Sequence, residues 1–551
     1  MVRRSPEAVT AAREVGFLVA DQVELPQVWY GATSAQQGIW ILDRIERLRP
    51  AYLIPSVLEF SGPIDHALFV SAVRQALGRH PALRSVFRLN VRRRQVEYRT
   101  DAAPPVVTFA DVPAGGWTPE DLDRRVLDRC YAPFDLAVEA PARAEIIRVD
   151  DTTTLLVLTV HHIVFDGWSR RLLVAEVAEI YQAALLDREP ELAEPGHPAD
   201  LLGVATEEEM AARISAVTDR LRGAPTSVPL PYDRPPVGDS PLTSGVVAVG
   251  FGPELTGRVL AAAAGEGCTA FMAGVALLAG TLGRASAQRD FLFAVVWPGR
   301  DDPASHGVVG MLMNTVVLRV GLGEHTTWRE LLRNTRAGAI DAFVDGDVPL
   351  APIAAALDAD RDVSRPPLTP VLINLAEVPG DVNLAPDVLG RYRPLDLMYS
   401  IWDLILFVHV DDSSGRARLE VSADYATNLF DRTTVTGLLE ALRHSAVDLT
   451  TSLEDPVLEP SSTEIDFNDP SARLELVRSV WSEVLGTNDI DDNTGFFDAG
   501  GNSLLLVALV EELSRASGRT FKTMDVFRAG SIAGQAELLT KAGDAVDGEP
   551  W

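Results

Sequence analysis

A short apolar run that ends in two histidines constrains the fold of this chain more than any other feature. Residues 155–160 read LLVLTV, a pattern typical of a buried strand, and residues 161–167 read HHIVFDG. Residues 168–186 then carry apolar side chains at helical spacing. The order of strand, loop and helix indicates an α/β fold in which both histidines and one carboxylate lie on a strand-to-helix loop.

The two adjacent histidines of this loop are expected to have different surroundings. Successive side chains of an extended chain point to opposite faces. If the strand continues into the motif, one of His161 and His162 faces a cavity, the other faces packing, and only one is catalytic. A packed core pair and a metal site are the other interpretations, and metal is disfavoured because no third ligand with recognisable spacing is nearby.

One positioned imidazole supplies what acyl transfer to an amine needs. The amine must be uncharged to attack a thioester, and its nitrogen carries a surplus proton once the new bond has formed. A histidine that titrates near neutrality accepts this proton. The thiolate leaves readily because the pKa of its thiol is about 8.5. The histidine loop is therefore interpreted as an acyl-transfer site.

The length and charge of the chain disfavour several classes of protein. A chain of 551 residues is too long for one ordinary core and indicates several domains. A net charge of -29 disfavours nucleic acid and anionic membranes as partners. Arg3 and Arg4 precede no apolar signal core, and no apolar window is long enough to span a bilayer, so we expect a cytoplasmic protein. The two cysteines are too few for a disulfide framework.

The pattern along the chain predicts two α/β halves and a small helical domain. In the first half, residues 30–45 and 64–79 are predicted helices with strand-like residues 52–60 between them. A proline-rich stretch, 225–241, precedes a second series of helix and strand patterns at 254–264, 270–283, 291–297 and 314–320. The polar run 459–468 is typical of an interdomain linker.

The small helical domain has a serine at the start of a helix. Its first helix is predicted to begin at Pro470, with Asp469 as N-cap. Residues 496–504 read FFDAGGNSL and lead into an apolar helix. A helix N-terminus presents free N–H groups and a partial positive charge, which would stabilise a phosphodiester on Ser503. The alternative is that Ser503 only caps the helix.

The segment around Ser503 resembles the attachment motif of peptidyl carrier (thiolation) domains of nonribosomal peptide synthetases, over about residues 469–539. The resemblance implies that Ser503 carries 4′-phosphopantetheine, added by a phosphopantetheinyl transferase. Gly530-Ser531 replaces the usual Pro-Thr before the last helix, which affects a helix start. Asn502 stands where the family often has His or Asp, and we infer no partner preference from it.

The histidine loop resembles the core motif of condensation domains of nonribosomal peptide synthetases, and the similarity covers about residues 27–450. Other segments that resemble family motifs, in the family's order, are 33–40, 79–84, 310–319 and 361–365. Residues 197–202, HPADLL, depart from the family, which usually has an aromatic-rich motif at this place.

The resemblance implies a role for each residue of a catalytic loop that comprises His161, His162, Asp166 and Gly167. His162 points into the reaction channel, as the general base or as a hydrogen-bond partner that positions the amine. His161 is structural, and Asp166 is an organiser that pairs with Arg300. Gly167 leaves room for the pantetheine arm or is a turn glycine. No metal is implied.

The resemblance also implies the fold: α/β, with two chloramphenicol-acetyltransferase-like lobes in a V, followed by a small all-α four-helix carrier domain. Donor and acceptor arms would enter a tunnel from opposite faces. The expected divisions are a leader at 1–24, the N-lobe at 25–190, the C-lobe at 191–456, a linker at 457–468, the carrier domain at 469–541 and a tail at 542–551.

Three functions fit these motifs. The leading hypothesis is amide formation between an acyl or peptidyl thioester, presented by an upstream donor carrier, and an amine. Ester formation on a hydroxyl would use the same His162. A non-catalytic recruitment platform is disfavoured because the loop is intact. No adenylation domain lies between residues 455 and 469, and no glycine-rich nucleotide loop is found, so we expect an adenylating enzyme to act in trans.

Overall fold

The computed structural model describes residues 28–112, 116–201, 205–236, 243–357, 366–376, 380–395, 398–411, 417–458, 469–485, 487, 490–517, 519 and 521–541. The leader, most of the linker and the tail expected from the sequence lie outside these residues. The chain divides into two compact units, Met1–Val457 and Leu458–Trp551.

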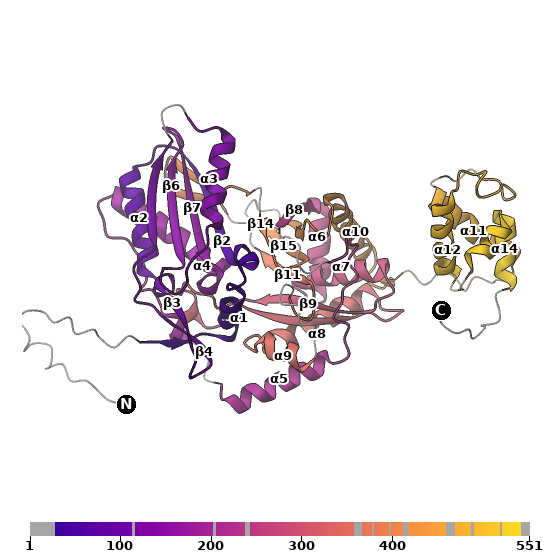
Figure 1. The fold of residues 1–551 in the computed structure, drawn as a ribbon, viewed down its shortest axis with the longest axis horizontal. Coiled ribbons are helices and arrows are strands. Elements are labelled where there is room, and N and C mark those ends of the chain that lie inside the picture. Colours follow the sequence, from indigo (N-terminus) through magenta and orange to yellow (C-terminus); the bar gives the residue numbers. More distant parts are fainter. Residues whose placement is uncertain are drawn as a thin grey trace, which may run out of the picture. The chain divides into compact units, whose positions relative to one another are not determined.

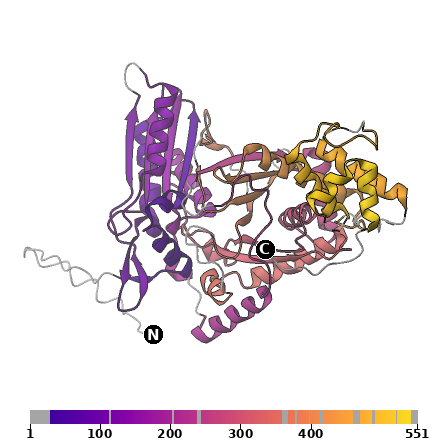
Figure 2. The ribbon, with the colours of Figure 1, turned by 45° about the vertical axis from the view of Figure 1, so that its right-hand side comes forward.

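The first lobe of the larger unit is built on a six-stranded sheet with the order β12-β13-β2-β7-β6-β5. Its strands are β2 (Leu53–Ser61), β5 (Val106–Asp111), β6 (Ala142–Arg148), β7 (Thr153–His161), β12 (Val382–Ala385) and β13 (Val388–Tyr392). Helices α2 (His66–Arg79) and α4 (Gly167–Leu185) pack on one face, and α3 (Pro119–Tyr131) packs on the other (Figures 1 and 2).

Strands β12 and β13 reach this sheet from the second half of the chain. β13 pairs with β2 so that Gly390 lies opposite Phe60. A Cβ atom on Gly390 would lie 2.4 Å from the Phe60 ring, so the close approach of the two strands requires glycine. The crossing ties the two lobes together, whereas the sequence pattern indicated two contiguous halves.

The first predicted helix is shorter than expected. Residues Tyr30–Gly31 form strand β1, which pairs with β4 (Gln95–Arg99), and helix α1 spans Ser34–Leu42. The reason is a capping box: the Thr33 side chain accepts from the Gln36 N–H, and the Gln36 side chain accepts from the Thr33 N–H. This reciprocal pair begins the helix at Ser34 and leaves the preceding residues extended.

The second lobe is built on a seven-stranded sheet with the order β10-β9-β11-β15-β16-β8-β14. Its strands are β8 (Thr243–Gly250), β9 (Asp290–Trp297), β10 (Asn314–Gly321), β11 (Val371–Ala376), β14 (Met398–Tyr399), β15 (Leu404–Asp411) and β16 (Arg418–Ala426). One face is covered by α6 (Gly252–Gly265), α7 (Ala270–Ala285), α8 (Trp328–Val344) and α10 (Arg432–Thr451).

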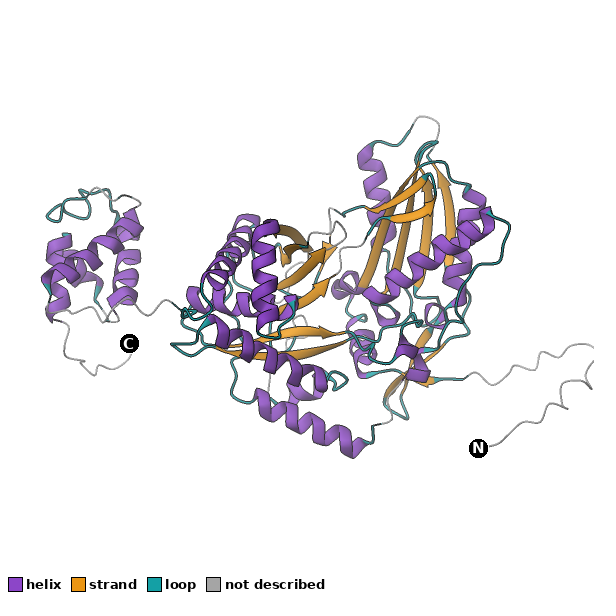
Figure 3. Ribbon diagram, turned by 180° about the vertical axis from the view of Figure 1, so that it is seen from behind, coloured by secondary structure: helices purple, strands orange, loops and turns teal. Residues whose placement is uncertain are grey.

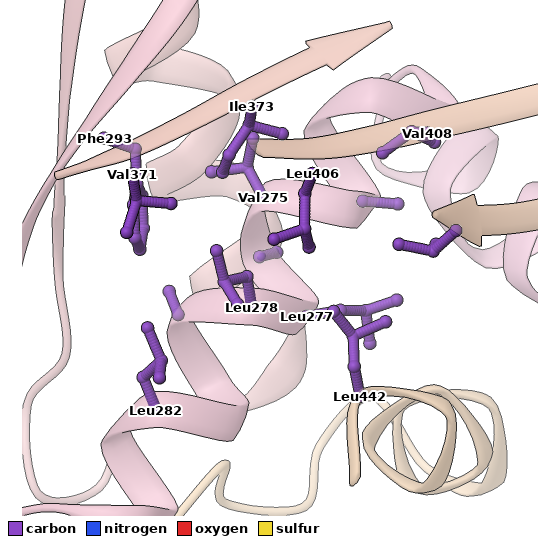
Figure 4. Close-up of a cluster of buried hydrophobic side chains, with 14 of the residues drawn as sticks. Val275, Leu277, Leu278, Leu282, Phe293, Val371, Ile373, Leu406, Val408 and Leu442 are labelled. Carbon is purple, nitrogen blue, oxygen red and sulfur yellow. The ribbon is translucent and has the colours of Figure 1, made fainter. Parts of the chain in front are cut away.

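The apolar core of this lobe lies between that face and its helices. In Figure 4, Leu278 of α7 lies beneath Ile373 and Leu406 of the sheet, and Leu277 faces Leu442 of α10. Helix α7 is apolar around most of its circumference because it is buried on most sides. Among the described residues no single helix could cross a membrane by length and apolar character, and one bent pair, α6 with α7 at 100°, passes that test only when both are counted together.

The opposite face of the second sheet is covered at one end only. Helices α5 (Glu207–Leu221) and α9 (Leu350–Ala356) pack against Leu292 of β9 and Val317 of β10. Over β8, β15 and β16 this face has no covering helix in the described chain, and it is turned toward the first lobe (Figures 1 and 3).

The smaller unit contains α11 (Pro470–Leu485), α12 (Ser503–Ser517), α13 (Thr523–Ala529) and α14 (Ile532–Lys541), as expected for a small all-α domain. The buried Trp481 ring meets Phe496 edge-on at 5.0 Å, and its N–H donates to Gln535 over 2.8 Å. At the departure from the family motif, Ser531 Oγ accepts from the Gly534 N–H at 3.2 Å. The serine therefore still caps α14.

Candidate active site

The two histidines lie at the point where strand β7 ends. His161 is the last residue of β7, and His162 opens a single 3-10 turn, His162–Val164, that precedes helix α4. The strand therefore ends between the two histidines, and the condition that it continues into the motif is not met. Their side chains have different surroundings because the backbone changes from strand to turn between them.

His161 is buried and fully engaged with the protein. Its Nδ1 accepts from the Ile163 N–H at 3.2 Å, so this nitrogen is unprotonated and Nε2 carries the hydrogen. Nε2 lies 3.3 Å from the Asp43 carboxylate, which accepts that hydrogen. Both ring nitrogens are thus occupied in holding the turn, and neither is available for catalysis.

His162 keeps one ring nitrogen available. Its Nδ1 lies 2.7 Å from the Phe165 carbonyl oxygen, and because a carbonyl only accepts, Nδ1 carries the hydrogen. The side chain is only partly accessible to solvent. Burial lowers the pKa of the imidazole, and this effect exceeds the opposing ones of the Phe165 hydrogen bond and the Asp166 charge. At neutral pH the ring is therefore neutral, with an unprotonated Nε2.

A buried glutamine supports the turn from the first helix. Gln36 Nε2 donates to the Ile163 carbonyl oxygen over 2.9 Å, in addition to its part in the α1 capping box. The peptide of Ile163 is thus held by Gln36 at its carbonyl and by His161 at its N–H. Gln36 lies in the segment 33–40 that resembles a family motif, and the resemblance assigned it no role. Its spacing from Thr33 was the available signal.

Asp166 caps helix α4 and is saturated with hydrogen bonds. Its Oδ1 accepts from Ser169 N at 2.8 Å and Ser169 Oγ at 2.7 Å. Arg300 Nη2 lies 3.1 Å from Oδ1 and 2.9 Å from Oδ2, and Leu312 N donates to Oδ2 over 3.3 Å. Both carboxylate oxygens are engaged by these donors, so the geometry fits an organiser of the loop.

Arg300 joins the two lobes through this carboxylate. It follows strand β9 of the second lobe, while Asp166 precedes α4 of the first, and both side chains are buried. Arg300 Nη1 also donates to the carbonyl oxygens of Ser305 and Val308, each over 2.6 Å. The preceding Gly299 has φ +65°, and a Cβ there would lie 2.1 Å from the Leu312 oxygen, so only glycine fits.

Gly167 begins helix α4 and is not a turn glycine. Its φ does not fall in the left-handed region, and the space that a Cβ would occupy is open. The backbone therefore does not require glycine here. A side chain at this position would meet open space.

Two of the other motif segments make side-chain contacts outside the histidine loop. Arg79 Nη1 and His80 Nε2 contact the Glu176 carboxylate at 3.1 Å and 2.7 Å, which ties the end of α2 to α4. Asn314 donates to the carbonyl oxygens of Gly346 and Val348. The segment 361–365 lies outside the described residues.

Residues 197–201 are the described part of the segment that departs from the family pattern, and His197 packs against the first lobe. The His197 ring lies 4.8 Å from the Tyr30 ring, and its Nδ1 accepts from the Ala199 N–H at 3.0 Å. This histidine thus occupies a packing position in the segment where the family usually has an aromatic-rich motif.

In the smaller unit, the turn before α12 places Ser503 at the first helical residue. Gly500 has φ +99°, and a Cβ on Gly501 would lie 2.4 Å from the Phe496 ring, so the turn needs both glycines. Asn502 Oδ1 accepts from the Leu505 N–H at 3.0 Å. The capping role that Ser503 might have had belongs to Asn502. This arrangement fits a phosphodiester held at the helix N-terminus.

Comparison with known proteins defines the class. The condensation-domain family profile matches residues 27–466, and the phosphopantetheine attachment site profile matches residues 475–539. The chain therefore belongs to the condensation-domain family. It combines a condensation domain of the nonribosomal peptide synthetase type with a carrier domain that bears the phosphopantetheine attachment site.

One relative is the isonitrile lipopeptide synthase of Mycobacterium tuberculosis (strain ATCC 25618 / H37Rv), which is 29% identical over 497 residues. The match covers 86% of this chain and 19% of that protein, so the chain spans about a fifth of the relative's length.

Two solved structures share the fold. The complex of the X-domain and OxyB from teicoplanin biosynthesis gives a TM-score of 0.68 at 23% identity, covering 79% of this chain and 95% of that chain. The first condensation domain of the calcium-dependent antibiotic synthetase, in complex with substrate analogue 3a, gives 0.61 at 22% identity, covering 78% and 98%.

Proposed function

We propose that the condensation domain joins a carrier-bound acyl or peptidyl group to an amine and so forms an amide. His162 is the base that accepts a proton from the amine nitrogen. The observation that carries this proposal is the 2.7 Å hydrogen bond from Nδ1 of His162 to the Phe165 carbonyl oxygen. It leaves Nε2 of a neutral imidazole free to accept a proton at neutral pH.

The proton balance assigns two steps to His162. The amine nitrogen attacks the thioester carbon, a carbon–nitrogen bond forms, and Nε2 accepts the surplus proton from that nitrogen. His162 then returns the proton to the sulfur as the carbon–sulfur bond breaks, so the products are an amide and a thiol. The alternative role, in which Nε2 only accepts a hydrogen bond that positions the amine, needs the same unprotonated nitrogen.

Asp166 and Arg300 act on this step through geometry. Their ion pair joins the loop to the second lobe, and the Asp166 charge opposes the lowering of the His162 pKa. The pair would hold His162 in place between the lobes, which we assign to residues 25–190 and 191–456 with residues 382–392 crossing over. Gly167 would leave space for the substrate arm.

The carrier domain supplies its chemistry through phosphopantetheine, whose thiol holds the acyl group as a thioester. We assign the attachment to Ser503, at the N-terminus of α12, by a phosphopantetheinyl transferase. The partners we propose are an upstream donor carrier and an adenylating enzyme that charges the arm in trans. Exchange of pyrophosphate into ATP by the purified chain should then stay at background with every proteinogenic amino acid, and a clear signal would contradict the assignment.

The test of the proposed function is a reconstituted condensation followed by intact-protein mass spectrometry. A loaded donor carrier and the phosphopantetheinylated chain with an amine acceptor should yield the joined product. With an acceptor amine that stays unprotonated throughout, the rate should fall about tenfold per pH unit below the pKa of His162, and the midpoint of this fall should lie below 6.5, the ordinary value for histidine. A midpoint above pH 6.5 would contradict a base whose pKa is lowered by its surroundings.

There are two alternative functions. One is ester formation, which would use the same residues, and the other is a recruitment platform, which would use none of them for catalysis. A hydroxyl acceptor attacked with the help of His162 would give an ester, and hydroxylamine sensitivity of the product separates it from an amide. A recruitment platform is supported by the likeness to the X-domain, whose structure was solved in complex with OxyB. Stable capture of a partner enzyme, with no covalent product from any donor and acceptor, would favour the platform.

A further inference from the structure

A carboxylate lies on the face of the second sheet that is turned toward the first lobe (Figure 3). Asp424 of β16 points to this face, because the alternate residues Ala423 and Tyr425 belong to the core on the other side. Strand register places Asp424 beside Ile405 of β15 and Val246 of β8. Its cross-strand neighbours are therefore both apolar.

Asp424 has no hydrogen-bond or ion-pair partner within the described part of the chain. Burial alone raises the pKa of its carboxyl to about 6, and no neighbouring positive charge offsets this. An ionised carboxylate in such surroundings costs free energy of folding. A partly accessible carboxyl that the protein leaves unpaired is suited to pairing with a ligand.

A second unpartnered polar group lies on the same face. Ser244 of β8 is 7% exposed, and its Oγ has no hydrogen-bond partner. Ser244 is opposite Ala426, two residues from Asp424, so the two side chains are diagonal neighbours about 7–8 Å apart. A group placed between them could bond to both. Ser422, on the other side of Asp424, is already bonded to His409 over 2.8 Å.

This part of the sheet lies next to the contact between the lobes. Strand β14 pairs with β8 through Tyr399 and Met398, and the Tyr399 ring lies 4.7 Å from the Tyr131 ring of the first lobe. Ile401, in the loop that follows, packs against the core of the first lobe. Asp424 and Ser244 thus face the region between the lobes, where the proposed function places the substrate arms.

We propose that Asp424 and Ser244 form a subsite for a cationic group of the substrate, a primary ammonium or a guanidinium on the side chain of the acceptor or the donor. The carboxylate would pair with the cation, Ser244 Oγ would accept one of its N–H groups, and Val246, Ile405 and Phe407 would contact the methylene groups that carry it. The inference rests on the proposed function, because it names the substrates of that site.

Asp424 is the charged group of the subsite, because the other charged side chains on this face are bonded elsewhere or lie farther along it. His409 of β15 is bonded to Ser422, and Glu420, Arg418 and Asp411 lie farther along the same face. β8 contributes no titratable side chain. Exposed Glu420 carries the same charge on the same face four residues away, which makes Glu420→Gln a matched control.

Binding is tested first, because it does not depend on turnover. The probes are unreactive pantetheine amides of lysine, ornithine and arginine, with norleucine as the neutral analogue of lysine, titrated into the full-length protein by calorimetry. At least one cationic probe should bind about tenfold or more tightly than norleucine. Asp424→Asn and Ser244→Ala should each reduce that ratio, and Glu420→Gln should keep it. Equal binding of all four probes, or a ratio that Asp424→Asn leaves intact, would overturn the subsite.

Turnover then identifies the side from which the cation comes. Lysyl and norleucyl forms are offered once as acceptors with a fixed donor and once as donors with a fixed acceptor. The preference for lysine should appear in one arm and be lost in Asp424→Asn. Condensation of neutral substrates without any preference for charge would refute the subsite and leave the proposed function intact. Tight binding of a cationic probe without any condensation would refute the proposed function instead.

The folding cost of the carboxylate gives an independent readout. Asp424→Asn removes a charge that burial disfavours, so this variant should melt at a temperature a few degrees higher than the parent chain. A lower melting temperature would show that Asp424 is stabilised by the protein itself, and this result would also count against the subsite.

Discussion

Helices α4 and α12, which begin beside the proposed functional residues, use the same capping device in opposite surroundings. Asp166 caps α4 by accepting from the N–H three residues on, and Asn502 caps α12 in the same way. Asp166 is 3% exposed and is joined to the second lobe by Arg300. Asn502 is exposed at the surface of a domain with its own small core. One local capping signal thus occurs in a buried, fixed loop and in an exposed, accessible loop.

The difference follows from what each loop has to do. The α4 loop would hold His162 in place for a proton transfer, and a buried ion pair restricts its movement. The α12 loop would present Ser503 to a transferase, and this would require an exposed turn. A rigid, buried setting at Ser503 would hinder modification, whereas an exposed setting at His162 would raise the pKa of the imidazole toward its ordinary value.

The largest effect is expected from a substitution in the accessible loop. Ser503→Ala should abolish the mass gain that a broad-specificity phosphopantetheinyl transferase and coenzyme A produce on the full-length chain, because the acceptor hydroxyl is removed. Ser514→Ala, farther along the same helix, is the control and should still be modified. A mass gain on the Ser503 variant would refute the assignment of the arm.

The second prediction separates the two histidines of the fixed loop. His162→Ala should lower the rate of product formation about 100-fold to 10,000-fold while folding and carrier loading persist. His162→Gln keeps a hydrogen-bond acceptor without a base and distinguishes proton transfer from positioning, since a glutamine that restores the rate would favour positioning.

His161→Ala should mainly reduce solubility and stability, because it leaves the buried Asp43 and Ile163 N–H without their partner. Melting curves and soluble yield measure this effect. Normal stability with lost turnover in His161→Ala, together with full activity of His162→Ala, would reverse the two roles.

The third prediction concerns the joint between the lobes. Asp166→Ala and Arg300→Ala should each cost about 3–5 kcal/mol of stability, since each leaves a buried charge unpaired. The double variant should lose much less than the sum of the two, as a double-mutant cycle by urea unfolding would measure. Additive losses would show that the two side chains act independently despite their 2.9 Å contact.

How far the sequence predicts the molecule depends on the range of each signal. Strand β7 and helix α4 follow from local patterns, and the start of α12 follows from the Asp-Ala-Gly-Gly-Asn-Ser segment. The partnership of Asp166 with Arg300 came from the family resemblance, because 134 positions separate the two residues and no periodicity links them.

Other features could not be predicted because they depend on long-range packing. The entry of β12 and β13 into the first sheet depends on Gly390 fitting against Phe60, and no local pattern encodes that pairing. The isolation of Asp424 depends on which strands adjoin β16. In the sequence alone, this aspartate cannot be told apart from an aspartate on the solvent-exposed face of a sheet.

The smallest effect is expected from a substitution that gives the accessible loop the same capping residue as the fixed loop, an aspartate. Asn502→Asp keeps a side-chain acceptor and adds a negative charge at the N-terminus of α12, which should stabilise the apo helix by about 0.3–1 kcal/mol. In the phosphopantetheinylated protein the phosphate would already lie at the same helix end, so like-charge repulsion should remove most of this gain. Hydrogen exchange of the first α12 amides in the full-length chain, measured before and after modification, gives both values. An equal gain in the two forms would mean that the phosphate does not lie at the α12 N-terminus, and the electrostatic reason given for the position of Ser503 would be wrong even though the serine itself is modified.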